Sequence, residues 1–361
     1  MGRDAVPAIE KLDNMAMLIL SIETSCDETS AAVVKNGSEI LSNVISSQVE
    51  FHKKYGGIVP EIASRKHIEV INPIIQEALD SAKVTFKDLD AVAVTHGPGL
   101  IGSLIVGLSA AKAIAYALNI PLIGVNHLEA HIYANFINPK SETLNPKQSQ
   151  NSKLKNPKFP FICLVVSGGH TMLVVVEDHG KYKVIGRTRD DAAGEAFDKV
   201  ARFLKIGYPG GPIIDKMAKE GNPTAINFTR PMLNDGFDFS FSGIKTAVVT
   251  HVKRNRDFQS QVPDLVASFQ QAIVDVLVTK TIRAAEEFDC RTIALAGGVA
   301  ANSCLRKELG EKGASKGINV IIPPLILCTD NAAMVGARGY YLFKEGKTSN
   351  FDLAAVASLR L

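Results

Sequence analysis

The stretch Leu18–Val34, LILSIETSCDETSAAVV, contains the pattern that decides the fold. Its first five residues, Leu18–Ile22, form an apolar run that predicts a buried strand. The polar segment Glu23–Ser30 predicts a turn, and Ala31–Val34 predicts a strand that returns beside the first. A strand, a polar turn and a returning strand are therefore expected to open the fold.

The first half of the chain continues with alternating strands and helices. Asn36-Gly37 predicts a tight hairpin turn, and a third strand is expected at Ile40–Ile45. The elements expected after it are a helix, a strand, a helix and a strand, at Glu61–Ala82, Ala91–Val94, Ser103–Leu118 and Leu122–Val125.

The second half repeats this order, beginning with a strand, a polar turn and a returning strand at Phe161–Val166, Ser167–Thr171 and Met172–Val176. A third strand is expected at Tyr182–Gly186, followed by helices at Glu195–Leu204 and Asp264–Phe288. Strands at Thr292–Leu295 and Ile318–Ile322 and a last helix from about Asp330 complete the second half. The sequence therefore predicts a duplicated α/β fold with two lobes around a nucleotide cleft. No G-x-x-x-x-G-K-[ST] string is present, so a P-loop does not supply phosphate binding.

Composition excludes several classes of protein. The 361 residues are 46% hydrophobic with a net charge of +3, which supports a large core and gives little overall attraction to polyanions. The five widely spaced cysteines predict reduced thiols rather than a disulfide framework. The uncharged stretch Gly97–Ala111 is shorter than a membrane span, which needs about 20 apolar residues, and predicts a buried helix. A soluble cytoplasmic protein without a membrane segment is expected.

Four segments are predicted along the chain. Residues 1–14 form a leader or tag, 15–137 an N-terminal lobe, 138–158 a disordered insertion rich in Lys, Asn and Pro, and 159–361 a C-terminal lobe. The lysines of the insertion could contact a phosphate backbone, although a solvated linker explains the same composition.

Three polar turns could bind phosphate or nucleotide. The turn Glu23–Ser30 combines hydroxyl groups with Asp27 and Glu28, which could hold a cation or orient an attacking group. Paired glycines in Ser167–Thr171 and in Ala296–Asn302 allow a ligand to approach the backbone closely. An ordinary hairpin or tight turn is the alternative for each.

His127 and His131 predict a metal site, because residues at i and i+4 lie on one face of a helix. Glu129 lies between them in sequence and points away from that face, so the general base of an H-E-x-x-H peptidase is missing. A third ligand must come from elsewhere, and Asp330 is the candidate. The alternative for Asp330 is the N-cap of the last helix.

Two further segments and a basic group are candidates for ligand contact. Gly194–Lys199 opens a helix with acidic residues that could bond a ribose or complement the helix dipole. Tyr208–Pro212 is expected to be a rigid loop. The basic residues that could contact a phosphate backbone are Lys245, Lys253, Arg254 and Arg256.

Together these strings resemble the TsaD family, which carries out tRNA threonylcarbamoyladenosine synthesis and was formerly called O-sialoglycoprotein endopeptidase; the bacterial form is the more similar. The matching strings run through nearly the whole chain: Ile22–Thr29, His96–Leu100, Asn126–His131, Val166–Thr171, Gly194–Lys199, Phe239–Lys245, Gly297–Asn302 and Cys328–Asn331.

The resemblance implies an actin/Hsp70/sugar-kinase-like (ASKHA) fold and a transferase. The implied reaction moves threonylcarbamoyl from threonylcarbamoyl-AMP to N6 of adenosine 37 in tRNAs that read ANN codons. Residues matching the family's metal ligands, for iron or zinc, are His127, His131 and Asp330. Residues matching its substrate loop and nucleoside positions are Val165, Val166, Ser167, Gly168, Gly169, Asp198, Gly211, Asp215 and Asn302. Asp27 and Glu28 match acidic catalytic positions.

The resemblance also implies tRNA, an adenylate or ATP, and TsaB-like and TsaE-like accessory proteins as partners. The chief rival function is a metal-dependent glycoprotein endopeptidase, which the missing base and the nucleotide-binding turns disfavour. A sugar or acetate kinase would not need the histidine pair. An Hsp70-like chaperone would need a substrate-binding domain for which the chain has no room.

Overall fold

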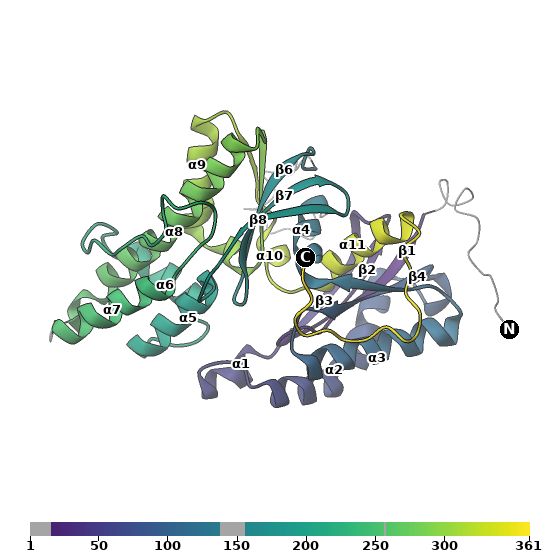
Figure 1. Cartoon of the computed structure of the whole chain (residues 1–361). Coiled ribbons are helices and arrows are strands. Elements are labelled where there is room, and N and C mark those ends of the chain that lie inside the picture. Colours follow the sequence, from purple (N-terminus) through teal and green to yellow (C-terminus); the bar gives the residue numbers. More distant parts are fainter. Residues whose placement is uncertain (1–15, 138–155, 256–257) are drawn as a thin grey trace. The chain divides into compact units, whose positions relative to one another are not determined.

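The computed structural model describes residues 16–137, 156–255 and 258–361, and these form two compact units (Figure 1). The described residues of unit 1 lie within Met1–Gln48, Val59–Leu154 and Asp330–Leu361. Those of unit 2 lie within Val49–Ile58 and Lys155–Thr329. The expected leader, 1–14, and most of the expected insertion, 138–158, lie outside the described residues.

Unit 1 contains a five-stranded sheet in the order β3-β2-β1-β4-β5. Its strands are β1 (Leu18–Glu23), β2 (Glu28–Lys35), β3 (Glu39–Ser47), β4 (Ala91–Gly97) and β5 (Leu122–Asn126). The first three strands pair antiparallel, whereas β4 and β5 extend the sheet in parallel with β1. Asn36 and Gly37 both have positive φ, as the predicted hairpin turn between β2 and β3 requires.

Unit 2 contains a second sheet in the equivalent order β10-β9-β6-β7-β8. Its strands are β6 (Phe161–Val166), β7 (Thr171–Asp178), β8 (Lys181–Arg187), β9 (Thr292–Ala296) and β10 (Asn319–Ile321). Again three strands pair antiparallel and two extend the sheet in parallel. The predicted duplication is therefore confirmed.

The helices of unit 1 cover its sheet. They are α2 (Pro60–Ala82), α3 (Ile101–Leu118), α4 (His127–Tyr133) and α11 (Ala332–Lys344), with short 3₁₀ turns η3 (Phe86–Asp88) and η4 (Ala134–Phe136). Ile71, Ile75 and Leu79 of α2 pack into one cluster with Leu20 and Val92 of the sheet. Burial of this apolar face, rather than intrinsic propensity, is the main source of the helix's stability.

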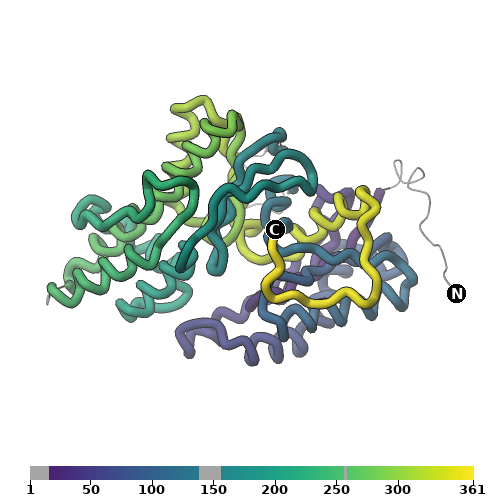
Figure 2. The backbone as a smooth tube through the Cα atoms, viewed as in Figure 1, coloured from purple at the N-terminus to yellow at the C-terminus, as the bar shows by residue number. Residues whose placement is uncertain are grey.

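The last part of the chain returns to unit 1, and this differs from the expected boundary, which placed all of 159–361 in the C-terminal lobe. Helix α11 packs on β1, β2, β4 and β5. Gly336 and Gly339 permit this close approach, because a Cβ at Gly336 would lie 2.7 Å from Val34 and one at Gly339 would lie 2.7 Å from Ala93. The tail then follows the ends of β4 and β5, where the Val356 N–H donates to the His96 carbonyl (Figure 2).

The helices of unit 2 are α1 (Val49–His52), α5 (Ala193–Leu204), α6 (Gly210–Met217), α7 (Ser242–Arg254), α8 (Val262–Glu287), α9 (Ser303–Ser315) and α10 (Leu325–Cys328), with 3₁₀ turns η2 (Lys53–Tyr55), η7 (Ala218–Glu220), η8 (Phe258–Gln261) and η9 (Gly298–Ala301). Helices α8 and α9 of unit 2 pack on its sheet. Two expectations were wrong here. The 49–58 segment belongs to unit 2, and the expected loop Tyr208–Pro212 runs into helix α6.

Two helical stretches are long and apolar enough to cross a membrane, namely Ile101–Leu118 and Phe258–Glu287. Most of the second is buried in the core of unit 2. The first, α3, was expected to be a buried helix, but only one face is buried. Ile101, Ile105 and Tyr116 are about half exposed or more.

Candidate metal centre and nucleotide-binding loops

Both histidines lie in α4, the short helix directly after β5, with His127 as its first residue and His131 in its last turn. The side-chain oxygen of Asn126 caps this helix, since it accepts hydrogen bonds from the backbone N–H groups of Leu128 and Glu129 at 2.8 and 3.4 Å. The cap fixes the helical turn that places His127 and His131 on one face, with ring centroids 4.6 Å apart. The structure therefore confirms the predicted helical pair.

Asp330 joins the two histidines from the start of the segment that returns to unit 1. Its Oδ1 lies 3.2 Å from His131 Nε2 and 3.6 Å from His127 Nε2. The alternative role as N-cap of the last helix belongs instead to Asn331, whose side chain accepts from the Met334 N–H at 3.0 Å. Asp330 is therefore not the side-chain cap of α11, and its carboxylate faces the two histidines.

The cluster has the chemistry of a divalent-metal site. One ligand atom from each of His127, His131 and Asp330 can be chosen so that all lie within 4.8 Å of one another. His131 is buried, and within the part of the chain that the structure describes neither of its ring nitrogens has a hydrogen-bond partner. An orphaned buried nitrogen beside a carboxylate fits a metal ligand, and two imidazoles with one carboxylate suit iron or zinc.

The charges around the cluster perturb both histidines. Burial opposes the charged form of His127, but Asp330 and Glu23 outweigh it and raise its pKa to about 9. Burial and the neighbouring His127 lower the pKa of His131. The centre therefore concentrates negative charge from Glu23 and Asp330 where a cation would bind.

Glu129 takes no part in this cluster. Its carboxylate forms an ion pair with Arg338 of α11, whose guanidinium also contacts Tyr133 Oη at 3.3 Å and Glu345 at 3.1 Å. The expectation that Glu129 points away from the histidine face is therefore confirmed, and Glu129 serves to join α4 to α11.

Asp27 ends the turn between β1 and β2, and Glu28 is the first residue of β2. The Asp27 carbonyl accepts from the Gln48 N–H at 3.0 Å, and Glu28 Oε1 accepts from the Ser47 hydroxyl at 3.3 Å. Burial, the carboxylate of Asp27 and that of Asp330 raise the pKa of Glu28 well above its usual value. The end of the turn and the start of β2 thus hold two neighbouring carboxylates, one of which is disposed to keep a proton.

In unit 2, the loop after β6 presents Gly168 and Gly169. The Ser167 hydroxyl accepts from the His170 N–H at 3.1 Å and closes the loop. A Cβ at Gly168 or Gly169 would meet no atom of the described residues within 4 Å, so packing does not demand glycine there. Val165 and Val166 form the buried end of β6 that leads into this loop.

The other predicted nucleoside positions of unit 2 lie at the starts of helices or contact them. Asp198 Oδ1 accepts from the Gly210 N–H at 2.7 Å at the start of α6, and Gly211 has open space around its Cα. Asn302 caps α9 and also donates to Gln270 at 2.8 Å. Asp215 accepts from the Ser303 hydroxyl at 2.8 Å. Asp215 and Asn302 therefore hold the start of α9 in place.

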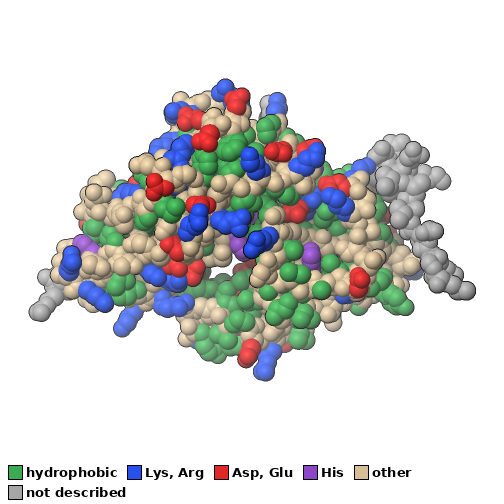
Figure 3. All heavy atoms as spheres, viewed as in Figure 1, with side chains coloured by type: hydrophobic (Ala, Val, Ile, Leu, Met, Phe, Trp, Pro, Cys, Tyr) green, Lys and Arg blue, Asp and Glu red, His purple; other side chains and the backbone are tan. Residues whose placement is uncertain are grey.

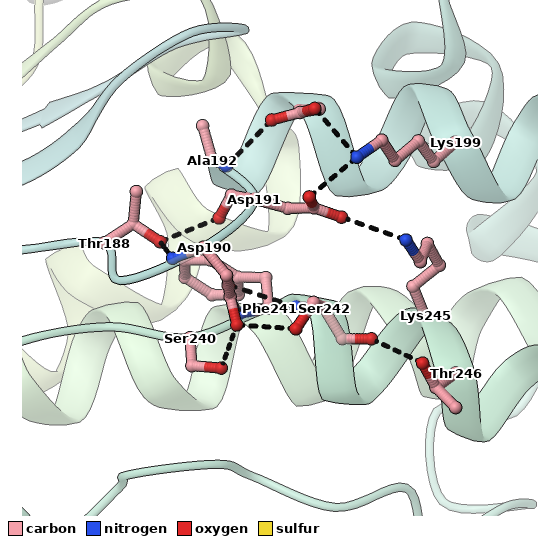
Figure 4. Close-up of polar contacts among 11 residues, drawn as sticks. Thr188, Asp190, Asp191, Ala192, Lys199, Ser240, Phe241, Ser242, Lys245 and Thr246 are labelled. Atoms are coloured by element: carbon pink, nitrogen blue, oxygen red, sulfur yellow. Dashed lines mark hydrogen bonds and ion pairs between the residues drawn. The ribbon is translucent and has the colours of Figure 1, made fainter.

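Two carboxylates with many contacts, Glu23 and Asp190, could not be recognised from the sequence pattern. Glu23 is fully buried beside His127. Asp190 accepts from the hydroxyls of Ser240 and Ser242 at 2.5 Å and caps α7 from outside the helix, while the adjacent Asp191 pairs with Lys199 and Lys245 (Figure 4). Lys245, expected to contact phosphate, is therefore engaged within unit 2.

The remaining basic residues lie around α7. Lys and Arg side chains gather along the edge formed by α5 and α7 (Figure 3), where Lys253 and Arg254 are exposed, and Arg256 lies outside the described residues. An open groove of about 680 Å³ follows one face of α7. Among the described residues its lining includes no Asp or Glu and offers Asn227, Thr250, His251 and Arg254.

Comparison with known proteins identifies the family. Residues 39–337 match the family described as "TsaD: tRNA N6-adenosine threonylcarbamoyltransferase". The chain is 55% identical over 348 residues to the tRNA N6-adenosine threonylcarbamoyltransferase of Clostridioides difficile (strain 630), covering 96% of this chain and 98% of that one. Identity to the enzyme of that name from Clostridium botulinum (strain Kyoto / Type A2) is 55% over 346 residues, covering 95% and 97%.

Solved structures share the fold at low sequence identity. The component A of (R)-2-hydroxyglutaryl-CoA dehydratase from Acidaminococcus fermentans aligns with a TM-score of 0.52 at 15% identity, covering 92% of this chain and 99% of that one. Full-length HypF aligns with a TM-score of 0.54 at 13% identity, covering 92% and 55%. These likenesses agree with the duplicated, two-lobe ASKHA-like fold. By its sequence matches, the chain belongs to the TsaD family of tRNA N6-adenosine threonylcarbamoyltransferases, which are transferases of t6A biosynthesis.

Proposed function

We propose that the chain takes its threonylcarbamoyl group from threonylcarbamoyl-AMP and delivers it to N6 of adenosine 37 in tRNAs that read ANN codons. The observation that carries the proposal is the His127, His131 and Asp330 cluster in a chain of this family. The exposed glycine loop of unit 2 supports an adenylate as the activated donor, because its backbone leaves room for a phosphate or nucleoside.

His127, His131 and Asp330 are the residues that would hold one divalent metal, iron or zinc. When bound, such a metal supplies a Lewis acid and a template for the carbonyl or carboxylate of the acyl group. Asp330 is partly exposed, with 19% of its side chain accessible, which leaves an approach to the cluster for substrate.

The remaining chemistry is assigned to this chain's own residues. Ser167, Gly168 and Gly169 would bind the adenylate, with Asp198 and Gly211 near its nucleoside. The N6 amine of adenosine forms a bond to the carbamoyl carbon, the bond from that carbon to the phosphate oxygen breaks, and AMP leaves. The amine proton passes to one of the neighbouring carboxylates of Asp27 and Glu28, where Asp27 is the expected acceptor because Glu28 is disposed to keep its own proton.

Two surfaces support macromolecular partners. The groove along α7, whose described lining has no carboxylate, fits a tRNA phosphate backbone, which Arg254 and His251 would contact. The exposed Ile68 of α2 and Ile101 and Ile105 of α3 favour a protein partner, in keeping with a TsaB-like protein. We also expect a TsaE-like protein as a partner and a cytoplasmic location for the enzyme.

The glycoprotein endopeptidase has no support. The matched relatives are named as transferases, and Glu129, the carboxylate between the histidines in sequence, is paired with Arg338. A peptidase would need a base beside the metal-bound water.

A reconstitution separates the two functions. The purified chain is supplied with tRNA, threonine, bicarbonate and ATP, together with an adenylate-forming enzyme and TsaB-like and TsaE-like proteins, and the digested tRNA is assayed for threonylcarbamoyladenosine by mass spectrometry. Product is expected with the parent and with His179→Ala, which alters a histidine in the β7–β8 turn, and is expected to vanish with His127→Ala. Absence of product, with metal-dependent cleavage of a glycoprotein, would assign the chain to the peptidases.

A further inference from the structure

Glu23, the last residue of β1, is a carboxylate without solvent exposure. Its Oε1 accepts from the Ser25 N–H at 2.6 Å. Its Oε2 accepts from the Thr95 hydroxyl at 2.6 Å and lies 3.1 Å from His127 Nδ1. Burying a carboxylate is costly unless its oxygens are hydrogen-bonded, and both oxygens of Glu23 are.

The contact with Glu23 gives the two ring nitrogens of His127 different protonation and different partners. Nδ1 faces the Glu23 carboxylate, which can only accept, so Nδ1 carries a proton and donates it. The Ser25 hydroxyl, 3.2 Å from the same nitrogen, adds a second contact on this side. Nε2 is then the nitrogen left to face Asp330 at 3.6 Å.

His131 has no equivalent support. Its Nε2 faces Asp330 at 3.2 Å, but among the described residues its Nδ1 has no hydrogen-bond partner, although the ring is more deeply buried than that of His127. Only His127 is therefore oriented by a carboxylate outside the proposed ligand set. Metal-binding histidines are generally held by such a carboxylate or carbonyl, which fixes the tautomer and the direction of the lone pair.

We propose that Glu23 is a positioning residue of the metal centre, which holds His127 in the tautomer that presents Nε2 to the metal, with Thr95 holding Glu23 in turn. The inference rests on the proposed metal site of His127, His131 and Asp330. It adds a residue that touches neither the metal nor the substrate and acts through His127.

The test compares Glu23→Gln with the parent and with Glu61→Gln, which neutralises a carboxylate of the same unit in the first turn of α2. Zn²⁺ affinity is measured by competition with a chromophoric chelator. Glu23→Gln should lower Zn²⁺ affinity about 10- to 100-fold, whereas Glu61→Gln should leave it unchanged. Glu23→Asp, which keeps the charge but shortens the reach, should recover part of the loss. Parental Zn²⁺ affinity in Glu23→Gln would overturn the proposal.

A second measurement needs no variant. Long-range ¹H–¹⁵N spectra of the Zn²⁺-loaded parent, labelled at histidine, should show His127 bound through Nε2 with a proton retained on Nδ1. Metal bound through Nδ1 would overturn the role of Glu23 while leaving the metal site intact. Full Zn²⁺ binding by His127→Ala would instead overturn the metal site and the role of Glu23 together, so the two failures are distinguishable.

Discussion

Arg338 of α11 and Glu129 of α4 form an ion pair in which the arginine side chain is 2% exposed. The guanidinium also stacks over the ring of Tyr133, 4.9 Å from its centroid. Because α4 carries the two histidines and α11 follows Asp330, this pair joins the two segments that supply the proposed metal ligands.

Arg338→Met should lower the free energy of unfolding by about 3 kcal/mol, because it leaves a partly buried Glu129 carboxylate without its cation. Zn²⁺ affinity should fall with it. Urea unfolding and chelator competition measure the two effects. The double variant Arg338→Met/Glu129→Gln should recover part of the stability, and unchanged stability of the single variant would contradict the structural role of the pair.

His131→Ala should lose most of the bound metal while keeping the fold, because the variant removes one of three ligands from a helix that Asn126 still caps. Metal content by elemental analysis and the far-ultraviolet circular dichroism spectrum measure the two properties. His179→Ala serves as the control for histidine removal. Full metal occupancy in His131→Ala would exclude this residue as a ligand.

Gly168→Val should weaken AMP or ATP binding at least about tenfold, which corresponds to about 1.4 kcal/mol. The added side chain would occupy the space in front of the loop, where a Cβ meets no described atom, so stability should be nearly unchanged. Isothermal titration calorimetry measures the binding. Gly310→Val, at another open position on α9, should bind nucleotide like the parent; equal binding by both variants would place the nucleotide site elsewhere.

Arg254→Ala should weaken tRNA binding several-fold and lower the slope of log K against log salt by about 1, as expected for the loss of one phosphate contact. Filter binding over a series of salt concentrations gives both values. The control is Arg291→Ala, which alters an exposed arginine 3.6 Å from Asp289. An equal loss of tRNA affinity in both variants would indicate a general effect of net charge and would contradict a phosphate contact in the groove.

Asp190→Asn should destabilise the protein by about 1 kcal/mol at pH 7, because the amide nitrogen that replaces Oδ2 cannot accept the hydrogen bonds from the Ser240 and Ser242 hydroxyls. Burial alone would raise the pKa of Asp190, but hydrogen bonds from Ser240, Ser242 and the backbone lower it below the usual 3.8. The ionised carboxylate therefore contributes to the free energy of unfolding above pH 3.8. This contribution is lost as the pH falls through the lowered pKa that Asp190 has in the folded protein. Urea unfolding at several pH values should show the parent and the variant converging in acid, and a constant difference would contradict the assignment.

The strands and the histidine pair could be predicted from sequence because their signals are local. Apolar runs, the Asn36-Gly37 turn and the spacing of His127 and His131 each lie within a few residues. The start of α6 could not be predicted this way, since the carboxylate that receives the Gly210 N–H comes from Asp198 in α5. The cap of α7 is likewise supplied by Asp190, far from the helix in sequence.

Glu23 was missed for a related reason. Its partners, Thr95 and His127, lie at the ends of β4 and β5 or just after them, and only the parallel order β1-β4-β5 brings the three strand ends together. A polar residue at the carboxyl end of each of three adjacent parallel strands is the signal that could have found the group.

The return of Asp330 and α11 to unit 1 also sets an order of events on the ribosome. Glu23 and both histidines leave the exit tunnel early, and the whole of unit 2 is translated before Asp330 follows. Until then the nascent sheet lacks helix α11, which packs on Ser21, Val34 and Ala93, and the two histidines lack the carboxylate of Asp330. The proposed ligand set is therefore completed only near the end of synthesis, and loading of the proposed metal would be a late step in the maturation of the chain.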